Sequence, residues 1–228
     1  RFGKGSALMS NTNTPIRVVL WRHGQTDWNV ENRFQGHSDI PLNKVGEYQV
    51  VEAAKVLAGL KPDRIISSDL LRAKKTAAAL AELTNIKVEI NPGIRETNGG
   101  LWEGRTATEN RSSHGDLFAK WYEGGDEPAG VTGERRSDVA RRAVAVIEKE
   151  TDNFSGTVVF VTHGGTVRSV LGSILKLPIP QWGIIGGLSN ACWSVLELTK
   201  HHTGSKWYLA EHNAGSLPEP VFGDDAVN

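Results

Sequence analysis

The 228-residue chain is poor in sulfur, with one cysteine, Cys192, and one methionine, Met9. A single cysteine cannot form an intrachain disulfide and leaves no CxxC metal site. The 26 Lys and Arg residues balance the 26 Asp and Glu residues, and no basic run is present. This balance argues against a nucleic-acid or membrane-surface partner. No apolar run is long enough to span a bilayer, so we expect a cytoplasmic protein.

The length and the near-average composition predict one globular domain, which we place at residues 9–213. The segment "RFGKGSAL" before Met9 has the character of an expression tag, so residues 1–8 are expected to be a remnant of one. Residues 214–228 are expected to form a flexible tail.

Short, β-branched apolar runs alternate with segments of helical periodicity along the chain. Strands are predicted at 16–21, 63–67, 87–90 and 157–162, and two closing, antiparallel-type strands at 192–198 and 206–211. Helices are predicted at about 43–60, 69–83, 106–121 and 134–149, and after residue 163. This alternation predicts a three-layer α/β fold, in which helices cover both faces of a mostly parallel sheet.

Two of the predicted strands end in the same way, in "VVLWRHG" and "VVFVTHGG". Because parallel sheets bind ligands at the carboxyl ends of their strands, His23 and His163 are expected in one crevice. Two imidazoles beside Arg22 could hold a dianion and attack it. The N–H groups of the glycines that follow, Gly24 and Gly164, and the positive end of the helix after His163, are expected to point inward.

A histidine at a strand end has other interpretations. Taken alone, it is more often a surface or hydrogen-bonded residue than a functional one. A zinc site is disfavoured because HxH and HExxH spacings are absent, so we expect no metal. The remaining histidines lack a comparable context and are expected to be solvated loop or strand-end residues: His37, His114, His201, His202 and His212.

An arginine and a glutamate are further candidates at the same sheet edge. Arg72, in the first turn of a predicted helix, could point outward, pair with Asp69, or offer its fork to an anion. Glu96 follows the third strand. Beside a phosphate it would keep its proton, and it could then protonate a leaving oxygen. Alternatively it pairs with Arg95, and Glu103 in the same loop is a rival acid.

Four blocks in this order resemble the histidine phosphatase superfamily, also called phosphoglycerate-mutase-like proteins: "RHGQTDWNVENRFQGHSDIPLNKVGEYQ", "SSDLLRAKKTA", "IRETNGGLWEG" and "VTHGGTVRSVL". The resemblance covers nearly the whole chain after Met9, and the order and spacing of the blocks make it specific. It implies a mixed, six-stranded sheet and a reaction that needs neither a metal nor a cofactor.

The resemblance also implies roles for individual residues. His23 would become phosphorylated, Arg22, Arg72 and His163 would bind the phosphoryl group, and Glu96 would donate the proton. We expect a neutral His23 to attack phosphorus, and a protonated His163 and the arginines to stabilise the transition state. Residues expected to bind substrate are Gly24, Asn29, Gln35, Gly36 and Gly164.

Two features favour a phosphatase over a mutase. The segment between Glu96 and His163 lacks the longer basic insertion of the family's mutases, and it carries a degraded "GGES" motif at Thr132-Gly133-Glu134. "RFQG" around Gln35 is also typical of the phosphatase branch. The alternatives are a cofactor-dependent phosphoglycerate mutase and a catalytically silent phosphate-binding module.

The sequence also bears on the substrate. "LKLPIPQWGIIGGLSNACWSVLEL" from Leu175 resembles the corresponding segment of actinobacterial glucosyl-3-phosphoglycerate phosphatases within the family. It implies a small phosphorylated acid or glycoside such as glucosyl-3-phosphoglycerate. Trp28 and Trp102 are expected at the rim of the pocket, whereas Trp182, Leu188 and Asn190 could contact a sugar or line the core. An edge strand near Cys192 could support a homodimer.

Overall fold

The computed structural model describes residues 15–201 and 204–215. The expectations for residues 1–8 and for most of the C-terminal tail therefore fall outside the described residues. The predicted start of the tail needs a correction. Ala214 is the last residue of strand β6 (Gly204–Ala214) and pairs with Trp193 of the neighbouring strand.

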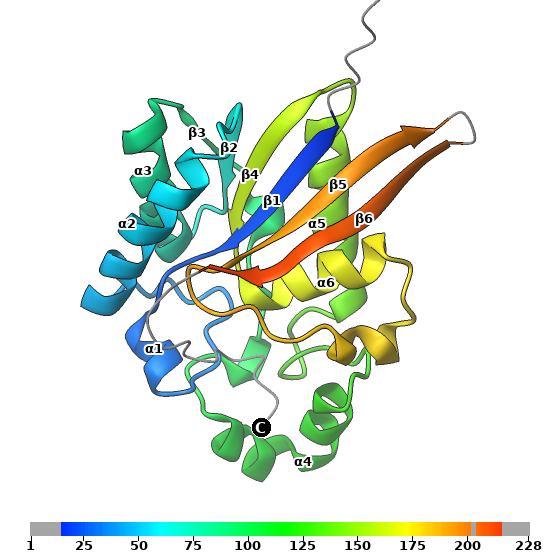
Figure 1. The fold of residues 1–228 in the computed structure, drawn as a ribbon. Coiled ribbons are helices and arrows are strands. Elements are labelled where there is room, and N and C mark those ends of the chain that lie inside the picture. The colour runs from blue at the N-terminus through cyan, green and yellow to red at the C-terminus, as the bar shows by residue number, and fades with distance from the viewer. Residues whose placement is uncertain (1–14, 202–203, 216–228) are drawn as a thin grey trace, which may run out of the picture.

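The described strands form one six-stranded sheet in the order β3-β2-β4-β1-β5-β6 (Figure 1). The other strands are β1 (Ile16–Arg22), β2 (Arg64–Ser67), β3 (Val88–Ile90), β4 (Gly156–Thr162) and β5 (Trp193–His201). β3, β2, β4 and β1 are parallel to one another, whereas β5 is antiparallel to β1 and to β6. The predicted mixed, mostly parallel sheet is confirmed.

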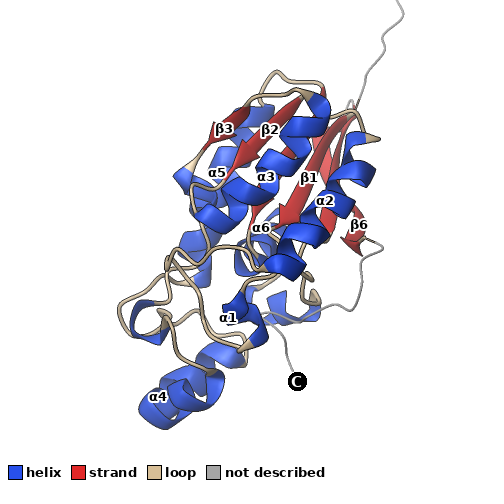
Figure 2. Cartoon of the chain, turned by 90° about the vertical axis from the view of Figure 1, so that its left-hand side faces the viewer, coloured by secondary structure: helices blue, strands red, loops and turns tan. Residues whose placement is uncertain are grey.

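Helices cover both faces of this sheet, as Figure 2 shows. Helices α2 (Lys44–Ala58) and α3 (Leu71–Thr84) lie on one face, and α5 (Arg136–Thr151) and α6 (Gly164–Ile174) lie on the other. Three layers form because the central strands are apolar on both faces and need helices on each side. The Asn43 side chain accepts the N–H of Gly46 and caps α2, as its sequence position predicts.

Strand β1 illustrates how the two cores are built. Val19 and Trp21 belong to the cluster formed with α2 and α3, while Val18 and Leu20 belong to the cluster formed with α5 and α6. Alternate side chains of a strand point to opposite faces, so a continuous apolar run serves both layers. Apart from Arg17, the strand is buried up to its last residue, where the first polar block begins.

A third cluster lies beyond the carboxyl ends of the strands, where helix α4 (Ala107–Tyr122) packs. Trp102 is 0% exposed and makes edge-on ring contacts with Phe34, Phe118 and Trp121. The expectation that Trp102 forms the pocket rim is therefore wrong, because the aromatic residues that meet there bury it. Trp28, half-buried, lies beside Gly104.

The short helix α1 (Asp27–Val30) occupies the segment that the sequence indicated as a polar loop. It is closed by a capping box in which Thr26 and Asn29 bond to each other's main chain. This helix holds Asn29 in a buried position close to the first histidine block. Within residues 15–201 and 204–215, no helix combines the length and the hydropathy that a bilayer span requires.

Candidate active site

The polar blocks meet where β1, β2 and β4 end. His23 follows β1, His163 follows β4, and their ring centroids are 5.2 Å apart with the planes inclined by 58°. The N–H of His23 donates to the carbonyl of Thr162 at 3.1 Å, which ties the two strand ends together. Both histidines are buried, at 2% and 0% exposure. The parallel register therefore brings together two rings that are distant in sequence.

The main chain around His23 fixes its tautomer. Nδ1 lies 2.7 Å from the carbonyl oxygen of Gly24, which can only accept a hydrogen bond. Nδ1 therefore carries the proton, and Nε2 keeps its lone pair. The carbonyl of His23 accepts the N–H of Ala191 at 3.0 Å and Nδ2 of Asn190 at 3.2 Å. The ring is thus held with Nε2 as its nucleophilic nitrogen.

Ser68 orients the second ring. Nε2 of His163 lies 2.9 Å from Oγ of Ser68, and the N–H of Leu70 donates to the same oxygen at 3.4 Å. Because a hydroxyl group can donate as well as accept, Ser68 can pair with either tautomer of His163, and the contact holds the orientation of the ring. Nδ1 is buried and has no hydrogen-bond partner among the described residues. When it is protonated, this nitrogen could donate to a bound anion.

The environment keeps both imidazoles neutral in the ligand-free protein. Burial is the main cause that lowers the pKa of His23 well below its usual value, followed by the charges of Arg72 and Arg22. Burial and then Arg72 likewise lower the pKa of His163. The expectation of a protonated His163 concerns the phosphate-bound site, and for that state it stays a prediction. A bound phosphate would oppose these effects, because a nearby negative charge raises the pKa of an imidazole.

Both predicted arginines are buried beside the histidines. Arg72 is 0% exposed and donates to the carbonyls of Gly36 and Ser38, each at 2.7 Å. It is buried and does not point outward, and Asp69 binds Arg95 through both carboxylate oxygens. Arg22 donates from Nη1 to the carbonyl of Leu188 at 2.5 Å. Main-chain carbonyls therefore orient both guanidinium groups.

Glu96 is anchored at the start of α6. Its Oε1 accepts the N–H groups of Thr97 (2.8 Å) and Thr166 (3.0 Å), and its Oε2 accepts the N–H of Gly165 (3.1 Å). The positive helix end that was expected to face a ligand therefore binds this carboxyl group. Because His163 is the residue that precedes α6, Glu96 is fixed beside the second histidine.

Gly24 also departs from expectation. Its N–H donates to Oγ1 of Thr76 at 3.2 Å instead of facing the site. A Cβ at this position would lie 2.6 Å from the carbonyl oxygen of Gly46, so glycine is needed here to let the loop touch α2. Gly164, the first residue of α6, is buried beside His163.

The other predicted substrate contacts are buried beside these groups. Asn29 is 0% exposed, and its Oδ1 accepts Nδ2 of Asn190 at 3.2 Å. Its own Nδ2 has no partner among the described residues and could donate to a ligand. Gln35 is 1% exposed. Gly36 has a φ of +50°, and a Cβ there would collide with the carboxylate of Glu103.

Comparison with known proteins adds to this geometry. Residues 18–213 match the sequence pattern of the histidine phosphatase superfamily (branch 1). The chain belongs to this superfamily. The glucosyl-3-phosphoglycerate phosphatase of Mycobacterium tuberculosis is 39% identical over 190 residues, covering 79% of this chain and 84% of that protein. The probable phosphoglycerate mutase GpmB of Yersinia enterocolitica is 33% identical, covering 72% and 76%.

Solved structures agree with the sequence comparison. The structure of a mycobacterial glucosyl-3-phosphoglycerate phosphatase complexed with VO3 superposes on this histidine phosphatase with a TM-score of 0.80. The two chains are 36% identical, and the match covers 87% of this chain and 99% of the other. The sequence-based identification as a phosphatase of this superfamily is thereby confirmed.

Ser68 and Thr76 of this histidine phosphatase site were not singled out from the sequence, and Asn190 was considered only as a sugar contact or a core residue. Ser68 orients His163, Asn190 links His23 to Asn29, and Thr76 binds the N–H of Gly24. Ser68 and Thr76 lie inside the block "SSDLLRAKKTA", so proximity to Arg72 was the available signal. The role of Asn190 depends on how the segment before β5 folds back, which no local pattern reveals.

Two residues have other surroundings than the sequence suggested. Glu103, the rival acid, accepts the N–H groups of His37 (2.8 Å) and Gly99 (3.0 Å) and the hydroxyl of Ser38 (2.8 Å), so it joins two loops. His37, expected to be solvated, donates from Nε2 to the carbonyl of Glu96 at 2.9 Å. The surroundings of both residues depend on tertiary contacts, because these hydrogen bonds join segments about sixty residues apart.

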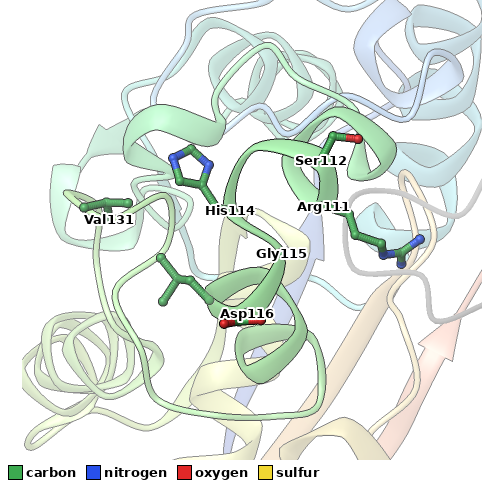
Figure 3. Close-up of a pocket in the computed structure, with 7 residues that line it drawn as sticks. Arg111, Ser112, His114, Gly115, Asp116 and Val131 are labelled. Atoms are coloured by element: carbon green, nitrogen blue, oxygen red, sulfur yellow. The ribbon is translucent and has the colours of Figure 1, made fainter.

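A depression of about 510 Å³ lies along a kink in α4, where His114 has non-helical backbone angles (Figure 3). None of its lining residues is among the predicted site residues. They are Arg111, Ser112, His114, Gly115, Asp116, Leu117 and Val131. Over the described part of the chain, no group of three or more His, Cys, Asp or Glu side chains is arranged to hold a metal ion.

Proposed function

We propose that this histidine phosphatase hydrolyses phosphate monoesters through a phosphohistidine on Nε2 of His23. The observation that carries the proposal is the contact of Nδ1 of His23 with the Gly24 carbonyl, which leaves Nε2 with a free lone pair. His23 is 2% exposed and lies beside His163. A protonated imidazole could not attack phosphorus, so the lowered pKa of His23, due first to burial, supports the same role.

The reaction divides into two displacements. Nε2 of His23 forms a bond to phosphorus while the ester oxygen departs with a proton from Glu96. Water then attacks the phosphohistidine, gives a proton back to Glu96, and releases phosphate. Arg22, Arg72 and Nδ1–H of His163 are proposed to bind the phosphoryl oxygens, because donors fixed before the reaction stabilise charge that develops in the transition state. A silent binding module would need no such nucleophile and acid together.

For the substrate, we propose a small phosphorylated acid or glycoside, with glucosyl-3-phosphoglycerate as the first candidate. The support is the 39% identity to a phosphatase named for that substrate. Phosphoglycerate mutase activity is the second candidate, because a relative named as a probable phosphoglycerate mutase is 33% identical. The degraded motif at Thr132-Gly133-Glu134 favours hydrolysis. A cytoplasmic location and a homodimer stay predictions, and gel filtration tests the latter.

The deciding experiment compares glucosyl-3-phosphoglycerate, 3-phosphoglycerate and 2,3-bisphosphoglycerate as substrates, with and without a bisphosphate primer. Phosphate release without primer is expected. Interconversion of 2- and 3-phosphoglycerate that depends on the primer would instead identify a mutase. Inactivity across a broad panel of esters would leave only the binding module.

The covalent step is tested with substrate labelled in its phosphate group and a rapid alkaline quench, which preserves phosphohistidine. The wild-type protein should carry label, and His23→Ala should carry none while its unfolding midpoint stays unchanged. Label retained in His23→Ala would contradict the assignment of the nucleophile.

A further inference from the structure

A hydrogen-bonded network lies behind the loop that carries Glu96. Arg142, on α5, donates from Nη1 to the carbonyls of Gly93 (2.9 Å) and Arg95 (2.8 Å). Its Nη2 donates to the carbonyl of Glu96 itself at 2.8 Å. One guanidinium group therefore holds three carbonyls of a four-residue stretch, and this fixes the direction of the main chain at Glu96.

Glu134 holds that arginine in place. Its Oε1 and Oε2 accept Nε and Nη2 of Arg142 at 2.7 and 3.0 Å, in the bidentate geometry that suits a guanidinium and a carboxylate. Oε2 also accepts the N–H of Asn98 at 2.8 Å. Burial works to raise the pKa of Glu134, but the bonds from Arg142 and Asn98 outweigh it and leave the pKa lowered. The carboxylate thus stays charged and reaches the far side of the Glu96 loop.

His37 completes the network from a third segment. Its Nε2 donates to the Glu96 carbonyl at 2.9 Å and lies 3.9 Å from Oε2 of Glu134. The carbonyl of Glu96 therefore accepts from both His37 and Arg142, while its carboxyl group binds the start of α6. Main chain and side chain of this residue are fixed by different elements.

We propose that Glu134 and Arg142 are positioning residues that set the place of the Glu96 carboxyl group during proton transfer. The inference rests on the proposed function, in which Glu96 is the acid. The loop continues into Asn98-Gly99-Gly100, and glycines alone would leave it mobile. An acid must lie within hydrogen-bond reach of the leaving oxygen, so small displacements of this loop cost rate.

The test uses Glu134→Gln and Arg142→Lys, with Arg141→Lys as the matched control. Arg141 is the neighbour on α5, and its side chain is 73% exposed. Each variant is assayed with glycerol 3-phosphate, a poor leaving group, and with p-nitrophenyl phosphate, a good one. For Glu134→Gln we expect kcat to fall about tenfold on the glycerol ester and less than about threefold on the aryl ester. KM should change by less than about twofold, and Arg141→Lys should match the wild type.

A second measurement separates positioning from general support of the fold. In a Glu96→Gln background the acid is gone, so Glu134→Gln should cause no further loss of kcat on the glycerol ester. A further loss of kcat when Glu134→Gln is added to Glu96→Gln would overturn the inference. So would equal losses of kcat on the two esters in Glu134→Gln alone. If Arg142→Lys fails to fold, Glu134→Gln with an unchanged unfolding midpoint decides alone. Absence of phosphoenzyme and turnover in the wild type would refute the proposed function instead, and this inference with it.

Discussion

Gly24 and Thr76 are joined across two elements: the N–H of Gly24 donates to Oγ1 of Thr76 at 3.2 Å, and that hydroxyl donates to the carbonyl of Arg72 at 2.7 Å. The residue after the first histidine is thereby linked to the helix that carries the second arginine. Two hydrogen bonds therefore connect the backbone beside His23, the proposed nucleophile, with the helix of Arg72, a proposed ligand of the phosphoryl group.

This close contact predicts the effect of Gly24→Ala. The added Cβ would lie 2.6 Å from the Gly46 carbonyl oxygen and 2.7 Å from Cγ1 of Val50, so the loop must move away from α2. We expect the free energy of unfolding to fall by about 1–3 kcal/mol and kcat to fall as well. Urea unfolding measures the first. Gly115→Ala is the control, because nothing lies within 4 Å of its added Cβ, and it should not destabilise.

Replacing the proposed acid should discriminate between leaving groups. Glu96→Gln keeps one oxygen to accept N–H groups at the start of α6 but has no proton of suitable acidity to give. We expect kcat on a sugar or glycerate phosphate to fall about 100-fold or more, and on an aryl phosphate far less. The measurement is the kcat of the variant and of the wild type on each of the two esters. Equal losses of kcat on both would show that Glu96 is not the acid.

Ser68→Ala should disturb the second histidine without removing it. Nε2 of His163 would lose its partner at 2.9 Å, so the hydroxyl would no longer hold the orientation of the ring or bias its tautomer. We expect weaker binding of phosphate or vanadate, by about three- to tenfold, and a matching fall in kcat/KM. Nitrogen-15 NMR of the imidazoles reads the tautomer directly. An unchanged tautomer together with unchanged inhibition by vanadate would contradict the role given to Ser68.

The buried neutral histidines predict how stability depends on pH. Burial, first, and nearby arginines lower the folded-state pKa values of His23 and His163, whereas the unfolded chain titrates near the usual value of 6.5. Below about pH 6.5 the unfolded state therefore binds protons that the folded state does not, and the free energy of unfolding falls. The stability that the two neutral rings contribute is fully present above that pH. Below it, the free energy of unfolding falls by up to about 1.4 kcal/mol per pH unit for each histidine.

Urea unfolding of the ligand-free protein between pH 7.5 and 5.5 measures this slope. His163→Gln should make it shallower, because one buried titrating ring is gone. A free energy of unfolding that stays level over the same range would mean that these rings take up protons equally in the folded and unfolded states, and that folding does not lower their pKa values.

The sequence by itself determined the strands, most of the helices and the polar blocks at the strand ends. These features depend on local signals. The run at residues 16–21 is apolar on both faces and became β1, and Asn43 capped α2 as predicted. The blocks around His23, Arg72, Glu96 and His163 were visible because each is contiguous in the chain. Helix α1 and the three short 3-10 helices at Pro92–Ile94, Gly100–Trp102 and Ile179–Ile184 were missed, since three to six residues are too few for a periodic pattern.

Only the tertiary structure decided how the groups in those blocks are bound and charged. The lowered pKa of His163, the bonds of Glu96 to the start of α6, the burial of Trp102 and the hold of Arg142 on the acid loop all result from contacts between distant segments. Burial and neighbouring charge set a pKa, and packing sets a side chain's partners. Both depend on which elements the sheet order brings together, and no local spacing in the chain encodes that order.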